Sequence, residues 1–139
     1  MKPNLLLCGL LALFFSAAVF AAPTPVEDSS ALKNAVILII RHAEKPEDGH
    51  GLSAAGMARA DAYVNYFKNY QVNGQPLKLT SLFATADSKQ SHRPRLTLEP
   101  TGKALGLTID SRFKDENYQG LVNELRSKPH GEGILIAWH

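Results

Sequence analysis

Apolar runs alternate with amphipathic segments along most of the chain. Short apolar runs predict strands over residues 35–40, 79–85, 107–109 and 133–138. Apolar residues at helical spacing predict helices over residues 53–70, 93–105 and 117–127. Strands that alternate with helices in this way indicate a parallel sheet with helices on both faces. The first strand is apolar without interruption, which is typical of a strand covered on both faces.

The segment from residue 53 to 70 has the clearest helical signals. Ser53 is a favourable N-cap, because its side chain can accept a hydrogen bond from the first turn. The apolar residues at helical spacing predict a stripe that faces the core: Leu52, Met57, Ala60, Val64 and Phe67. Residues 71–78 contain Asn73-Gly74-Gln75-Pro76 and predict a turn, and Gly106 ends the second helix.

The N-terminus has the pattern of a secretory signal peptide over residues 1–21. Lys2 precedes an apolar run that is shorter than the roughly 20 residues of a membrane span. Small residues around Ala21 predict cleavage after that position, so we expect a secreted or periplasmic protein with no membrane attachment after cleavage. Residues 22–34 predict a flexible lead, and residues 35–139 predict one domain.

Composition narrows the possible functions. The chain has 15 basic and 13 acidic residues, for a net charge of +2, and no basic tract that indicates nucleic-acid binding. Its single cysteine, Cys8, lies in the predicted signal peptide. The mature chain therefore has neither an internal disulfide nor a thiol nucleophile.

Residues suited to an anion follow three of the predicted strands. Arg41 and His42 follow the first strand, Arg93 comes after the second, and His139 follows the fourth. The carboxyl ends of parallel strands meet at one edge of a sheet, where ligands bind. Arginine offers a planar fork of donors that fits phosphate, and neutral imidazole can attack phosphorus. Two histidines and two arginines together can transfer a phosphoryl group without a metal.

Several motifs, in this order, resemble those of the histidine phosphatase superfamily. Arg41-His42-Ala43-Glu44 is similar to the Arg-His-Gly signature, and residues 52–60 are similar to the helix start that follows it. Arg93 and Thr97 resemble the Arg-x-x-x-Thr motif, and His139 lies where the family has its second histidine. The resemblance implies a phosphoglycerate mutase-like α/β/α sandwich of three layers with a mainly parallel central sheet. It also implies His42 as the nucleophile, Arg41 and Arg93 as phosphate clamps, and His139 as a second catalytic residue.

The chain departs from the family pattern at three places. Ala43 replaces the usual glycine, and the spacing before Arg93 leaves Arg95 as an alternative clamp. The family continues beyond the position of His139, so we expect this sequence to be truncated and Ile134 and Ile136 to lack a covering helix. The general acid is not identified; the candidates are Glu44, Asp115 and Glu116.

These features predict an exported phosphatase that needs no metal or other cofactor. Its substrate would be a phosphomonoester or phosphohistidine, in a small molecule or a phosphoprotein. One alternative is a non-catalytic module of the same fold that binds phosphate or a phosphoprotein. A second is a metal site that combines His42 with Glu44, His50 and His92, although the cationic neighbours Arg41 and Lys45 and the spacing disfavour it.

Overall fold

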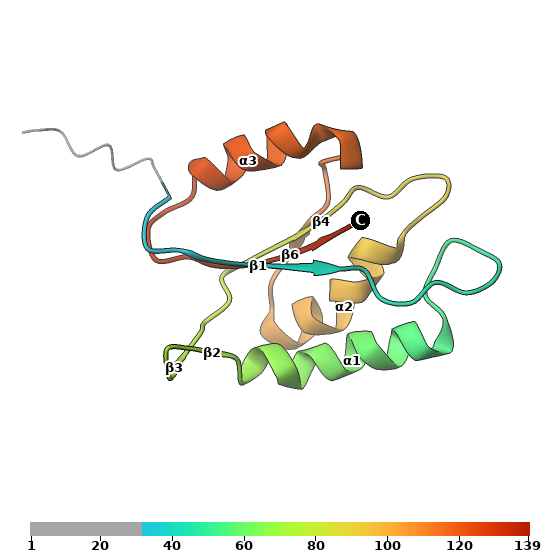
Figure 1. Cartoon of the computed structure of the whole chain (residues 1–139), viewed down its shortest axis with the longest axis horizontal. Coiled ribbons are helices and arrows are strands. Elements are labelled where there is room, and N and C mark those ends of the chain that lie inside the picture. The colour runs from blue at the N-terminus through green and yellow to red at the C-terminus, as the bar shows by residue number, and fades with distance from the viewer. Residues whose placement is uncertain (1–31) are drawn as a thin grey trace, which may run out of the picture.

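The structure is a computed structural model that describes residues 32–139 (Figure 1). Four parallel strands form a sheet in the order β1-β6-β4-β5. Their bounds are β1 Val36–Arg41, β4 Ser81–Ala84, β5 Ile109–Asp110 and β6 Gly133–Trp138. The helices are α1 Ala54–Lys68, α2 Arg93–Leu105 and α3 Tyr118–Arg126, with a short 3₁₀ helix at Asp115–Asn117. The predicted α/β class with a parallel sheet is confirmed.

Helices cover both faces of the sheet, as the alternation of elements predicts. Helices α1 and α2 pack on one face and α3 on the other (Figure 1). On the first face, Phe67 of α1 and Leu98 of α2 pack with residues of β4 and β6. On the second, Leu121 and Leu125 of α3 pack against Phe83 and the isoleucines of β6. Two separate apolar clusters therefore fix the helices on the sheet.

Strand β1 lies at an edge of the sheet and is not covered on both faces. It pairs with β6 alone among the described strands, and every second side chain along it is more exposed than its neighbours. Ile37 is 38% and Ile39 is 70% exposed. The expectation of a strand buried on both sides is wrong, because an unbroken apolar run does not say where in a sheet the strand lies.

Strand β6 is buried instead, contrary to what the sequence suggested for its isoleucines. Ile134 and Ile136 are 0% and 2% exposed, because α3 covers them together with Phe83. The helix that precedes β6 in the chain thus protects the face that we expected to be open.

The sequence signals at the helix ends are largely confirmed. The Ser53 side chain accepts a hydrogen bond from the Gly56 amide at 3.1 Å, as predicted for an N-cap. Helix α2 has Pro94 in its first turn and ends at Gly106, whose φ of +67° suits glycine. The predicted stripe on α1 is wrong at Met57, which is 55% exposed.

The segment between α1 and β4 is more ordered than a simple turn. Residues Gln71–Val72 (β2) and Gln75–Pro76 (β3) form a two-stranded antiparallel hairpin. Asn73 and Gly74 connect the strands with positive φ at both positions, the conformation that a tight hairpin turn needs.

The predicted signal peptide lies outside the described residues, as does most of the predicted lead. Within residues 32–139, no helix is long and apolar enough to span a bilayer. Leu32 already packs against the α3 cluster, and the Lys33 carbonyl accepts a hydrogen bond from the Gly131 amide at 2.9 Å. The last residues of the predicted lead therefore contact the domain.

Candidate phosphate site

A cationic cavity lies at the carboxyl ends of β1 and β6. It has a volume of about 510 Å³, and its wall includes Arg41, His42, Arg93 and His139. All four residues predicted to handle phosphate therefore come together, although more than 50 residues separate some of them in the chain. Lys45 and Arg59 also line the cavity, so its charge is strongly positive.

His42 is held in an orientation that suits a nucleophile. Its Nδ1 lies 2.7 Å from the Ala43 carbonyl oxygen, which can only accept, so Nδ1 carries the proton. The lone pair of Nε2 is then free. Burial lowers the pKa of His42, the hydrogen bond to Ala43 opposes this, and the charges of Arg93, His139 and Arg41 lower it further. These effects favour the neutral imidazole, the form that can attack phosphorus.

His139 lies beside His42 in the cavity wall. The two ring centroids are 5.3 Å apart and the ring planes make an angle of 76°. The strand pairing explains this proximity, because Arg41 lies opposite Trp138 and the His42 amide donates to the Trp138 carbonyl at 3.2 Å. The register of β1 against β6 thus sets the separation of the two histidines.

Thr97 connects the end of β1 to the start of α2. Its buried Oγ1 accepts a hydrogen bond from the Ala43 amide at 2.9 Å and donates to the Arg93 carbonyl at 2.8 Å. One hydroxyl therefore links the neighbour of His42 to Arg93. This gives a physical role to the Arg-x-x-x-Thr spacing, since a threonine four residues after Arg93 lies one helical turn further on, against the segment that follows β1.

Helix α1 fixes the loop that follows His42. The Glu44 carbonyl accepts from the Ser53 amide at 2.9 Å, and a Cβ on Gly56 would overlap the Glu44 backbone. The Glu44 carboxylate pairs with Arg59, whose Nε is 3.0 Å from Oε2. A hydrogen bond from its own amide and the Arg59 guanidinium hold the pKa of the Glu44 carboxyl below its usual range.

Sequence reasoning missed Arg59 and Lys45 as cavity residues. Arg59 follows Gly56 by three positions on α1, which places it on the helix face that Glu44 approaches. The sequence signal that could have revealed Arg59 was a glycine in the first turn of the helix that follows the Arg-His signature.

The geometry also separates the two candidate clamps. Arg93 lines the cavity with His42, and its Nε–H is buried without a hydrogen-bond partner among the described residues. Arg95 points elsewhere, because its guanidinium binds Asp87 at 2.8 Å and also pairs with Glu99. Arg93 is therefore available to an anion in the cavity, whereas Arg95 is occupied.

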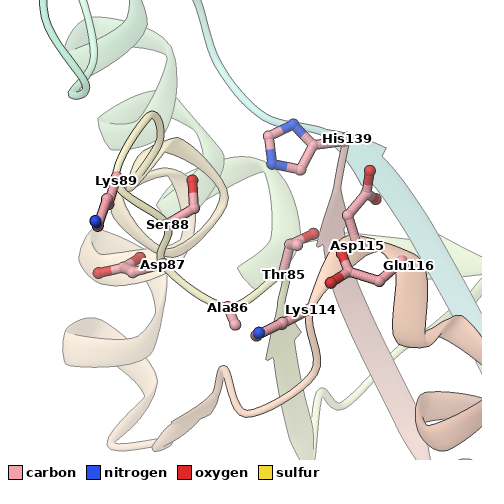
Figure 2. A pocket seen from close by; sticks show the side chains of 9 residues that line it. All are labelled: Thr85, Ala86, Asp87, Ser88, Lys89, Lys114, Asp115, Glu116 and His139. Carbon is pink, nitrogen blue, oxygen red and sulfur yellow. The ribbon is translucent and has the colours of Figure 1, made fainter.

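A second cavity of about 560 Å³ adjoins the first and shares His139 with it (Figure 2). One wall follows β4 and the other follows β5. The second wall carries Asp115 and Glu116, two of the three candidate general acids. The third candidate, Glu44, is held by Arg59 in the first cavity.

The residues of the alternative metal site do not assemble. His42 and Glu44 line the first cavity, whereas His50 stacks edge-on against His92, with 6.3 Å between ring centroids. His92 Nδ1 lies 3.1 Å from Asp87. Across residues 32–139, no group of three or more histidine, cysteine or acidic side chains is arranged to hold a metal ion.

The chain matches no protein-family model, and a comparison with curated proteins finds no significant match.

Proposed function

We propose that the protein is an exported phosphatase of the histidine phosphatase superfamily. It hydrolyses a phosphomonoester or phosphohistidine through a phosphohistidine intermediate on His42. The observation that carries this proposal is the cavity whose wall combines His42, held by its Nδ1 contact to the Ala43 carbonyl, with His139, Arg41 and Arg93. The four-stranded parallel sheet with helices on both faces is compatible with the phosphoglycerate mutase-like three-layer sandwich of that superfamily.

In the first step, Nε2 of His42 attacks phosphorus as the bond from phosphorus to the leaving group breaks. Arg41 and Arg93 hold the non-bridging oxygens, and His139 donates a hydrogen bond to the charge that develops on them. The leaving group takes up a proton as it departs. In the second step, water attacks phosphorus, the nitrogen–phosphorus bond breaks, and orthophosphate leaves.

The fold favours the second cavity as the place where the leaving group departs. Asp115 and Glu116 line that cavity together with His139, so one of them is the proton donor if the leaving group needs one. Phosphohistidine and aryl phosphates depart readily and need little protonation. The chemistry of the four cavity residues calls for no metal or other cofactor.

Export rests on the sequence. The signal-peptide pattern of residues 1–21 places the enzyme in the periplasm or outside the cell, where its partner is a phosphorylated small molecule or a phosphoprotein.

Replacement of His42 tests the proposal. We expect His42→Ala to abolish hydrolysis of an activated aryl phosphate while circular dichroism shows a folded protein. His50→Ala, a histidine change outside the cavity, is the matched control and should keep its activity. Full activity in His42→Ala would refute the assignment. Phosphate binding without any turnover in the unmodified protein would instead favour a binding module.

A further inference from the structure

Two lysines lie in the second cavity on opposite walls. Lys89 follows β4 and Lys114 follows β5 (Figure 2). Neither makes an ion pair within residues 32–139, although three carboxylates line the same cavity. Both ammonium groups are therefore available to a ligand.

The two walls are held together at their base. The Ala86 amide donates to the Phe113 carbonyl at 2.7 Å, which joins the segment after β4 to the segment after β5. Lys89 and Lys114 lie three residues and one residue beyond that bond, one on each side. The separation of the two lysines is thus set by the fold and not by side-chain rotation alone.

Each lysine is also presented by a defined local structure. Lys89 lies in a tight turn in which the Ser88 amide donates to the Ser91 carbonyl at 2.9 Å and Ser88 Oγ accepts from the Ser91 amide at 3.1 Å. Lys114 precedes the 3₁₀ helix, and its carbonyl accepts from the Asn117 amide at 2.9 Å.

The charges are ordered along the cavity. In Figure 2, Asp115 lies nearer to His139 than Lys89, Lys114 and Glu116 do, and Glu116 lies on the same wall as Lys114. Asp87, the acid on the first wall, pairs with Arg95 and lies 3.1 Å from His92 Nδ1. Burial raises the pKa of the Asp87 carboxyl, but these partners outweigh burial and lower it. A leaving group that departs beside Asp115 would extend toward the two lysines.

We propose that the second cavity is a subsite for a leaving group that carries a second anionic group, bound between Lys89 and Lys114. The substrate class is therefore a phosphomonoester with a phosphate or carboxylate at some distance from the reacting phosphate. This inference rests on the proposed function, because the phosphoryl group must be bound beside His42.

The test uses a matched pair of probes, 1,4-butanediol bisphosphate and 4-hydroxybutyl phosphate. Exposed charge pairs each contribute up to about fivefold in affinity. With two lysines, we therefore expect the full protein to prefer the bisphosphate by up to about 25-fold in kcat/KM, beyond the statistical effect of its two equivalent phosphates. A probe with a distal carboxylate, 4-phosphooxybutanoate, distinguishes the two anion types.

The double variant Lys89→Gln and Lys114→Gln should reduce the preference to about its statistical value. Lys103→Gln, a change of equal charge in the last turn of α2, should keep it. Equal kcat/KM for both probes in the unmodified protein would overturn the proposal, as would an equal loss of preference in Lys103→Gln.

Binding separates this proposal from the proposed function. Calorimetric titration of His42→Ala with each probe measures recognition without turnover, and we expect the same order of affinities. Tighter binding of the bisphosphate with no hydrolysis by the unmodified protein would support the subsite and refute the phosphatase. Hydrolysis with no difference in binding would refute the subsite alone.

Discussion

Thr97→Val removes one hydroxyl that serves both halves of the site. Valine keeps the shape of threonine, so the buried volume hardly changes. The Ala43 amide loses its acceptor at 2.9 Å, and the Arg93 carbonyl loses a donor at 2.8 Å. Both threonine and Ala43 are fully buried, so water cannot replace the lost acceptor without a rearrangement.

An unpaired buried backbone amide costs about 1–3 kcal/mol. We therefore expect Thr97→Val to lower the free energy of unfolding by about 2 kcal/mol, a large share of the 5–15 kcal/mol typical of a domain. With a urea m-value of about 1–3 kcal/mol/M, the unfolding midpoint should fall by roughly 1 M. Activity should fall by more than the loss of folding stability alone explains. Ala43 adjoins His42, and a displacement of His42 by about 1 Å can cost on the order of 10²-fold in rate.

Urea unfolding followed by circular dichroism measures the effect, with two control variants. Thr97→Ser keeps the hydroxyl and should retain most of the stability. Thr101→Val alters a hydroxyl on the same helix that is equally buried but has no partner among the described residues. That change should be neutral or stabilising. Equal midpoints for Thr97→Val and Thr101→Val would refute the reasoning.

Three further predictions follow from the same contacts. Gly56→Ala should cost about 1–3 kcal/mol in urea unfolding and reduce activity, because the new methyl group overlaps the Glu44 backbone; a gain in stability, as in an open helix, would contradict this. Arg93→Lys should lower kcat/KM for an aryl phosphate by about 10²–10³ because the planar fork is lost, whereas Arg95→Lys should change it little; the reverse order would move the clamp to Arg95. Burial and nearby positive charges lower the pKa of His42, so its neutral form persists as pH falls. The acidic limb of the pH profile of kcat/KM should therefore have an apparent pKa below that of an ordinary histidine. In Arg93→Met that pKa should rise, as measured by NMR titration of the His42 ring, and an unchanged pKa would count against the electrostatic account.

The elements with strong local signals could be predicted from the sequence. Helix α2 and strand β6 have the predicted bounds, because prolines, Gly106 and flanking polar residues mark their ends. The order of strands could not be predicted, since it depends on contacts between distant segments. For that reason the exposure of Ile39 on the edge strand β1 was missed.

The site was predictable where its residues lie at the end of a strand or directly after it. Arg41, His42 and His139 are brought together by the register of β1 against β6. Arg59 and Lys114 were missed, because they reach the cavities through helix packing and a loop contact. Such contacts leave no periodic signal in the sequence.

The most direct test of the central claim is whether phosphate becomes covalently attached to His42 during turnover. The protein is mixed with a radiolabelled aryl phosphate, and the reaction is stopped rapidly without acid. Peptide mapping then locates the attached label. The account predicts a label that is stable to alkali, labile to acid and located on the peptide that contains His42. Hydrolysis of the substrate without such a label, or an equal label in His42→Ala, would contradict it.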